Sequence, residues 1–244
     1  MSGRAYGATS GQGGMSPKGE TTPVHLRPAT LDPVDKKVIC KAICVCSREP
    51  DAGVSGQGLK QQCVSRNLRD VDRSMGWKSP YKSEVNYDMT QIPPSPIMRS
   101  ASPLEPHPYL PGWIQKYWPG GKDAYPAGAG AVRRPDVVIV KDGSLPPTQD
   151  NIESVVEIKF PPQERDREQE DDYARIAGSP EKVATMGPGD CDCSDDDANE
   201  SPLRAVSEAL SELGRSLRQL LNRSPAIPPG MGGLPLPPPP IVVP

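Results

Sequence analysis

Two short runs of β-branched residues stand out in the pattern of apolar and polar positions along the chain. They occupy residues 136–140 and 154–160, and each is bounded by Gly, Pro or polar residues. Runs of this length and composition predict β-strands. An Asp142-Gly143 turn signal follows the first run. The pattern therefore predicts a hairpin with a longer connecting loop.

The second predicted strand carries a carboxylate and an ammonium group two positions apart. Side chains alternate across a strand, so Glu157 and Lys159 are expected on one face and Ile158 on the other. Pairing of the two strands would bring Asp136, at the start of the first strand, beside Glu157 and Lys159. Two carboxylates and an ammonium group on one sheet face favour binding of a hard divalent cation and an anionic substrate.

Apolar residues recur at helical spacing in three further segments. Residues 57–76 form one predicted helix, which Gly76 would end, and residues 163–177 form a charged helix that Gly178 would end. Residues 202–222 carry a Leu-rich stripe. This stripe predicts an amphipathic helix that packs on the core or binds a partner.

Two clusters of side chains each have a structural and a functional interpretation. A basic helix face is usually solvated, but it can also steer a phosphate-bearing ligand. An aromatic cluster usually packs in the core, but it can also form a platform beside a nucleic acid backbone. The basic cluster comprises Lys60, Arg66, Arg69 and Arg73, and the aromatic cluster comprises Trp113, Tyr117 and Trp118.

Composition limits the size of the core. The 244 residues include 32 Pro and 23 Gly but only 1 Phe, which predicts one modest core with long irregular flanks. Residues 92–112 are rich in Pro and are expected to form a wrapped loop without regular structure. The expected division is a flexible leader (1–33), a Cys-rich segment (34–56), the main domain (57–180), an acidic linker (187–201), the amphipathic helix (202–222) and a Pro-rich tail (223–244).

The cysteines fall into two groups. The first comprises Cys40, Cys44, Cys46 and Cys63, and the second comprises Cys191 and Cys193. The first group is expected either as small buried apolar side chains or as part of a metal site or disulfide clip. The second group lacks metal-binding partners at a useful spacing, so it is expected in a solvated linker.

Charge and hydropathy exclude several classes of protein. The formal net charge of −3 gives no bulk attraction to nucleic acid, so binding to a polyanion would require a local basic patch. No apolar run approaches the roughly 18 residues that a membrane-spanning helix needs. The N-terminal Gly- and Ser-rich segment lacks the apolar stretch of a secretory signal peptide, so the chain is expected to be made in the cytoplasm.

The chemistry that the two strands favour is metal-assisted attack on a phosphate. Asp136 and Glu157 would supply carboxylate ligands to Mg²⁺, and the Ile158 carbonyl would supply a third oxygen. Lys159 would orient the attacking water and stabilise the developing charge. No Ser/His/Asp or Cys/His set competes, since both histidines lie in irregular Pro-rich segments. The candidate phosphate-binding residues are Arg133 and Arg134.

The order of these residues resembles the PD-(D/E)xK nuclease superfamily. Arg134-Pro135-Asp136 is followed by Glu157-Ile158-Lys159, and then by Gln169 and Tyr173 on the next predicted helix. The resemblance is to the VRR-NUC-like branch and to restriction-endonuclease-fold toxin domains, and it covers residues 57–180. It implies an α/β (α+β) fold with a restriction-endonuclease-like core, in which helices flank a mixed central sheet. It also implies Mg²⁺ or Mn²⁺ as cofactor and hydrolysis of DNA phosphodiester bonds.

The resemblance also assigns roles to individual residues. By position, Asp136 and Glu157 match the metal-binding carboxylates, and Lys159 matches the catalytic lysine. The glutamine and tyrosine of the following helix match its catalytic residues. Glu84 matches the acidic residue supplied by the helix before the sheet, which would make it a third metal ligand.

The setting resembles an antibacterial toxin that a type VI secretion system delivers. The low-complexity leader, the Cys-rich segment and the small nuclease core are the features behind this resemblance. It implies secretion without a signal peptide, action on DNA in the cytoplasm of a target cell, and a cognate immunity protein. Residues 202–244 would contact the secretion apparatus or a chaperone. The alternatives are a non-catalytic binding module and a DNA repair nuclease of phage or host.

Overall fold

The structure, a computed structural model, describes residues 30–193 together with Glu208 and Ser211. Most of the predicted leader, most of the helix predicted at 202–222 and the predicted tail at 223–244 lie outside the described residues. In the part of the chain that the structure describes, no helix is both long and apolar enough to cross a membrane.

Helices and strands alternate irregularly along the described chain. The helices are α1 (Pro33–Arg48), α2 (Lys60–Ser74), α3 (Leu110–Tyr117), α4 (Gly121–Ala124) and α5 (Arg167–Ala177), with 3-10 turns at Pro180–Lys182 and Pro188–Asp190. The strands are β1 (Asp51–Ala52), β2 (Gly58–Leu59), β3 (Tyr81–Ser83), β4 (Tyr87–Asp88), β5 (Ser95–Pro96), β6 (Met98–Arg99), β7 (Ser102–Pro106), β8 (Val132–Arg133), β9 (Val137–Val140), β10 (Ile152–Ile158) and β11 (Val183–Met186).

A four-stranded mixed sheet forms the centre of the molecule. Its strand order is β11-β10-β9-β3, with β10 antiparallel to β9 and parallel to β11. Val156 on β10 pairs with Val137 on β9, so the two predicted strands form the predicted hairpin. The edge strand β3 is antiparallel to β9. The chain is therefore a mixed α+β protein, as the sequence predicts.

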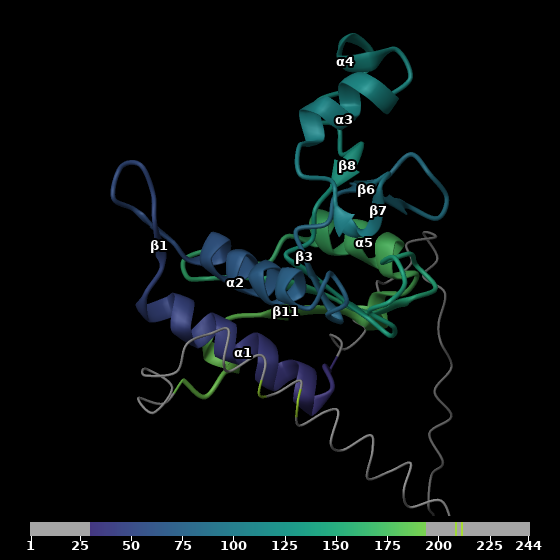
Figure 1. The fold of residues 1–244 in the computed structure, drawn as a ribbon. Coiled ribbons are helices and arrows are strands. Elements are labelled where there is room, and N and C mark those ends of the chain that lie inside the picture. Colours follow the sequence, from purple (N-terminus) through teal and green to yellow (C-terminus); the bar gives the residue numbers. More distant parts are fainter. Residues whose placement is uncertain (1–29, 194–207, 209–210, 212–244) are drawn as a thin grey trace, which may run out of the picture.

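Helices cover both faces of this sheet (Figure 1). Val137 and Ile139 on β9 pack in the cluster that contains α1 and α2, whereas Val138 and Val140 pack in the cluster that contains α5. Because β9 is buried on both faces, its sequence is a continuous apolar run rather than an alternating one.

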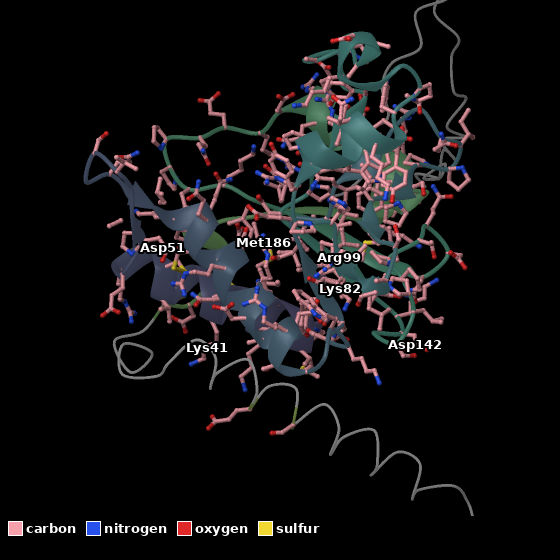
Figure 2. All side chains as sticks on the ribbon, turned by 45° about the horizontal axis from the view of Figure 1, so that its top comes forward. Lys41, Asp51, Lys82, Arg99, Asp142 and Met186 are labelled. Atoms are coloured by element: carbon pink, nitrogen blue, oxygen red, sulfur yellow. A yellow bond between two sulfur atoms is a disulfide. The ribbon has the colours of Figure 1, made fainter. Side chains whose placement is uncertain are left out.

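A buried ion pair joins α2 to β3. The ammonium group of Lys82, a residue labelled in Figure 2, lies 2.9 Å from the Asp72 carboxylate, and both side chains are almost fully buried. Burial raises the pKa of Asp72 and lowers the pKa of Lys82, and their mutual attraction opposes both changes. The Lys82 Nζ also donates to the Trp77 carbonyl at 2.6 Å, so the pair fixes the chain just after α2.

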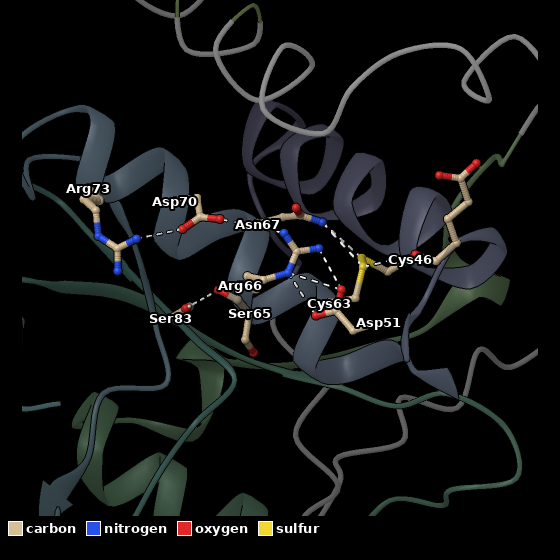
Figure 3. A network of polar contacts seen from close by, with 10 residues as sticks. Cys46, Asp51, Cys63, Ser65, Arg66, Asn67, Asp70, Arg73 and Ser83 are labelled. Atoms are coloured by element: carbon tan, nitrogen blue, oxygen red, sulfur yellow. Dashed lines mark hydrogen bonds and ion pairs between the residues drawn. A yellow bond between two sulfur atoms is a disulfide. The ribbon is translucent and has the colours of Figure 1, made fainter. Parts of the chain in front are cut away.

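All six cysteines form disulfide bonds. The pairs are Cys40–Cys191, Cys44–Cys193 and Cys46–Cys63, and the last of these lies beside Asp51 at one end of α2 (Figure 3). The first two join α1 to the segment after β11, across 151 and 149 residues of sequence. The expectation of a solvated linker is therefore wrong for residues 187–193, because partners so distant cannot be inferred from local spacing.

Residues 92–112 contain short regular elements instead of the expected irregular loop. β6 pairs with β7, β5 pairs with β4, and α3 begins at Leu110. The prolines occupy positions that tolerate them, such as the edges of short ladders and, for Pro111, the first turn of α3. Together with α4, these elements form an extension that projects from the central sheet (Figure 1).

The aromatic cluster lies on this extension, so the expectation of core packing is wrong. Tyr117 is 44% exposed, and Trp113 and Trp118 are half-buried. The ring centroids of Trp113 and Tyr117 lie 6.0 Å apart, and those of Trp118 and Tyr125 lie 4.9 Å apart. Trp113 therefore pairs with Tyr117 and Trp118 with Tyr125, and Ile114 is the only buried residue of α3.

Helices α2 and α5 confirm the helices predicted at 57–76 and 163–177, although each begins later than predicted. The start of α5 is set by Asp166, whose carboxylate accepts hydrogen bonds from two backbone N–H groups of the first turn. Gly178 ends the helix with a φ of 82°, a conformation that favours glycine.

Candidate functional site

The hairpin brings three of the predicted site residues together at one end of the central sheet. Asp136 directly precedes β9, Glu157 lies near the end of β10, and Lys159 follows β10. The Lys159 Nζ lies 2.9 Å from the Glu157 Oε1, so the two side chains share a face as the strand alternation predicts. Their face is the one that α5 covers, because Val155, two positions before Glu157, packs in the α5 cluster.

Asp136 is oriented by the neighbouring strand. Its Oδ2 accepts a hydrogen bond from the Ile158 backbone N–H at 2.7 Å. Burial, and then the negative charge of Glu157, raise the pKa of the Asp136 carboxyl to about 7, with a smaller contribution from Glu84. A cation between the Asp136 and Glu157 carboxylates would relieve this repulsion.

Glu157 has an incompletely paired carboxylate. Its side chain is buried, and its Oε1 contacts Lys159. Its Oε2 is the only buried side-chain oxygen or nitrogen among the described residues that has no hydrogen-bond partner. Leaving a buried carboxylate oxygen unpaired costs about 1–3 kcal/mol or more, so such an atom calls for a partner.

A chain of hydrogen bonds fixes the Lys159 side chain. Its Nζ donates to the Gln169 Oε1 at 2.9 Å, and the Gln169 Nε2 donates to the Tyr173 hydroxyl at 2.9 Å. The Tyr173 hydroxyl in turn donates to the Arg134 carbonyl at 3.2 Å. Burial and the charge of Glu157 raise the pKa of Tyr173, so its hydroxyl keeps the proton that this bond requires. α5 thereby positions the lysine through residues four apart on one face.

Glu84 lies next to this group but its carboxylate has other partners. It follows strand β3 rather than belonging to a helix, and its backbone N–H donates to the Asp136 carbonyl at 3.0 Å. Its side chain forms an ion pair with Arg69 and lies 3.8 Å from the Arg134 Nη2. Among the residues that the structure describes, no three His, Cys, Asp or Glu side chains form a group that could hold a metal ion.

The Ile158 carbonyl, the predicted third oxygen ligand, has a partner that the sequence did not indicate. The Gln61 Nε2, from the first turn of α2, donates to this carbonyl at 2.6 Å. A carbonyl oxygen has a second lone pair, so this bond leaves one acceptor position. No local pattern marks Gln61, because its contact depends on how α2 docks against the end of β10.

The two arginines before Asp136 have different environments. Arg133 forms ion pairs with Asp172 and, at 3.2 Å, with Glu168, both from α5. The hydrogen bond that Arg133 donates to Asp172 raises the pKa of Arg133, and the pairs join β8 to α5. The Arg134 side chain is 56% exposed. Of the two, Arg134 therefore has the more accessible guanidinium group.

The site thus combines two crowded carboxylates, one carbonyl oxygen and a fixed ammonium group. Asp136 and Glu157 fit a divalent cation, since one has a raised pKa and the other has an unpaired buried oxygen. No family model, curated protein or solved structure matches this chain. Its function is therefore inferred from its own side chains.

Proposed function

We propose that this protein is a metal-dependent deoxyribonuclease with a restriction-endonuclease-like core. The observation that carries the proposal is the unpaired, buried Glu157 Oε2 beside the crowded Asp136 carboxylate, next to a lysine that Glu157 and Gln169 hold in place. Structural ion pairs normally satisfy both carboxylate oxygens. Two carboxylates that repel each other and a fixed ammonium group are typical of a site that binds a cation and a phosphate.

The metal ligands in this proposal are the Asp136 and Glu157 carboxylates and the Ile158 carbonyl. They would hold Mg²⁺ or Mn²⁺, both of which prefer oxygen ligands. When bound, such a cation supplies Lewis acidity and positive charge for phosphodiester hydrolysis. Glu84 remains a candidate fourth oxygen ligand, which would require its carboxylate to leave Arg69.

Lys159 acts on the reacting phosphate in this proposal. Its Nζ orients the attacking water and stabilises the negative charge that develops on the phosphate. Its contacts with Glu157 and Gln169 fix its position before substrate arrives. Gln169 and Tyr173 act through the lysine as positioning residues.

The arginines have separate roles in the proposed reaction. Arg134, with its exposed side chain, binds a phosphate of the DNA strand. Arg133 holds α5, and with it Gln169, against the sheet. A substitution of Arg134 should therefore weaken DNA binding, whereas a substitution of Arg133 should also disturb the position of the lysine.

We also propose a biological setting, that of an antibacterial toxin with a cognate immunity protein. The support for export is the presence of three disulfide bonds, which are typical of proteins that pass through an oxidising compartment. Delivery by type VI secretion and action in the cytoplasm of a target cell remain part of this proposal. This setting is tested by expressing the chain in cells with and without a candidate immunity gene. A chain that is not toxic in cells without that gene would contradict the proposed setting.

The biochemical proposal is tested by the metal dependence of DNA cleavage. The purified full chain is incubated with supercoiled plasmid and Mg²⁺, Mn²⁺, Ca²⁺ or EDTA. The proposal predicts nicked and linear products with Mg²⁺ or Mn²⁺ and none with EDTA. Intact plasmid under every metal condition, from protein whose circular dichroism shows a folded chain, would overturn the proposal.

A further inference from the structure

A polar hollow of about 230 Å³ lies beside the candidate site. We call it the arginine hollow. Its lining includes Arg69, Arg73, Trp77, Glu84 and Arg134. Glu84 and Arg134 connect it to the site, since the Glu84 N–H donates to the Asp136 carbonyl and the Arg134 carbonyl accepts from Tyr173. A ligand in the hollow would therefore lie next to a group bound at Asp136.

Three arginines, two glutamates (Glu84 and Glu105) and the Trp77 ring line the hollow. Arg69 and Arg134 both pair with Glu84, which keeps their guanidinium groups at the wall of the hollow. The Arg73 guanidinium carbon lies 5.5 Å from the centre of the Trp77 ring. Cationic donors beside an aromatic face are suited to a phosphate and a stacked base.

The backbone of the hollow is strained at two positions. Trp77 has a φ of 62° and Glu84 has a φ of 51°, and these are the only non-glycine residues with positive φ in the described chain. Such conformations are sterically unfavourable for residues with a side chain and gather at ligand sites, where the surrounding structure enforces them. Both strained residues line the same hollow.

Contacts on both sides of Trp77 enforce its conformation. Its N–H donates to the Asp72 carbonyl at 2.7 Å, and its carbonyl accepts from the Lys82 Nζ at 2.6 Å. Asp72 and Lys82 form the buried ion pair between α2 and β3. A core ion pair therefore fixes the backbone of a half-exposed tryptophan. Packing of the Trp77 side chain would not by itself require this backbone conformation.

We infer that the arginine hollow binds one unpaired nucleotide of the DNA strand, adjacent to the bond that is cut. The base stacks on Trp77, and Arg73 and Arg69 bind the phosphate. The inference rests on the proposed nuclease function and adds a substrate class to it, namely single-stranded DNA or frayed ends. Pockets for drug-sized ligands measure roughly 300–1,000 Å³, so this smaller hollow suits a single base or phosphate. A base within an intact duplex would first have to leave the stack.

The first test follows Trp77 fluorescence without metal. The chain contains three tryptophans, so Trp113→Phe/Trp118→Phe leaves Trp77 as the single emitter. In EDTA, a short single-stranded oligonucleotide should quench this emission, and a blunt duplex of the same length should do so only at about tenfold higher concentration. Equal quenching by both DNAs, or none by either, would overturn the inference.

The second test compares binding by matched variants. Trp77→Leu and Arg73→Ala should each weaken single-strand binding by about tenfold in EDTA, while Trp77→Phe should retain most of it because it keeps an aromatic face. The control is Arg66→Ala on the same helix, since Arg66 pairs with Asp51 (Figure 3) and does not line the hollow. Equal losses in Arg66→Ala and Arg73→Ala would contradict the inference.

These outcomes separate the inference from the proposed function, because neither binding test needs cleavage. If the chain cleaves plasmid but its binding to single strands does not depend on Trp77, the nuclease proposal stands and the inference about the arginine hollow is overturned. Single-strand binding that depends on Trp77, in a chain that cleaves nothing, would support the hollow as a nucleotide site and overturn the nuclease proposal. Thermal unfolding of each variant identifies any loss that arises from misfolding.

Discussion

The backbone N–H of Ile158 donates to the Oδ2 of Asp136 at 2.7 Å across the β9–β10 hairpin. This bond fixes the rotation of the Asp136 side chain relative to the strand that carries Glu157. The register of the hairpin, with Val156 opposite Val137, therefore sets the separation of the two carboxylates. A shift of one residue would turn Glu157 to the opposite face of the sheet.

The raised pKa of Asp136 predicts a pH-dependent stability in the metal-free protein. The pKa is about 7 in the folded chain and 3.8 without perturbation, so the folded state binds this proton more tightly than the unfolded state. Protonated Asp136 therefore stabilises the folded state fully below about pH 4, and this contribution is lost as pH rises through about 7. Asp136→Asn removes this loss, because an amide stays neutral at every pH.

Asp136→Asn should therefore raise the Tm of the metal-free protein most at about pH 8, and little at about pH 4, where wild-type Asp136 is mostly protonated in the folded state and about half protonated in the unfolded state. A rise of several degrees is expected, since about 1 kcal/mol shifts the Tm of a chain of this size by about 2–4 °C. Thermal unfolding in EDTA at both pH values measures the effect. An equal Tm for the variant and the wild type at the higher pH would show that the pKa of Asp136 is not raised in the folded chain.

Bound metal should reverse this destabilisation. Mg²⁺ or Mn²⁺ should raise the Tm of the wild type, and more at about pH 8 than at about pH 5, because the metal binds the deprotonated carboxylates. Glu157→Gln should abolish the increase. Glu153→Gln, on an exposed position of the same strand, should retain it. A metal-induced rise that survives in Glu157→Gln would place the metal elsewhere.

The hydrogen bonds that fix Lys159 predict a kinetic role for Gln169. Gln169→Leu removes the acceptor of the Lys159 Nζ and the donor to Tyr173. DNA cleavage should fall by about 10–100-fold, as is usual for residues that orient a catalytic group, while DNA binding should change little. Asp171→Asn, an exposed change on the same helix, serves as control. A parallel loss of DNA binding would instead indicate a general disturbance of α5.

The disulfide between α1 and α2 predicts a measurable contribution to stability. Cys46 and Cys63 are separated by 17 residues, and closing a loop of this size stabilises the folded state by about 3 kcal/mol in the chain-entropy account. Urea unfolding of Cys46→Ser/Cys63→Ser should show a loss of this order. Reductant should then destabilise the wild type more than it destabilises this variant. An unchanged urea midpoint would mean that packing alone joins the two helices.

Local sequence patterns were sufficient to predict the helices and strands that depend on short-range spacing. The hairpin of β9 and β10 follows from two apolar runs and a turn signal, and α2 and α5 follow from helical spacing with glycine at their ends. The grouping of Asp136, Glu157 and Lys159 follows from strand alternation together with that hairpin. Each of these inferences needed only short-range spacing and one pairing.

The features that the sequence did not reveal depend on long-range contacts. Cys40 and Cys191 are 151 residues apart, so only the folded chain shows them as partners. Gln61 reaches the Ile158 carbonyl only because α2 docks at the end of β10. The position of Glu84 after β3, with its carboxylate on two arginines, likewise depends on how α2 and β3 pack.

The most direct measurement of the central claim compares Glu157→Gln with Glu153→Gln in plasmid cleavage with Mg²⁺. Both changes replace a glutamate on β10 by glutamine, but only Glu157 contacts Lys159 and has the unpaired buried oxygen. We expect Glu153→Gln to cleave like the wild type and Glu157→Gln to cleave no more than the wild type does in EDTA. Wild-type cleavage by folded Glu157→Gln would contradict this expectation.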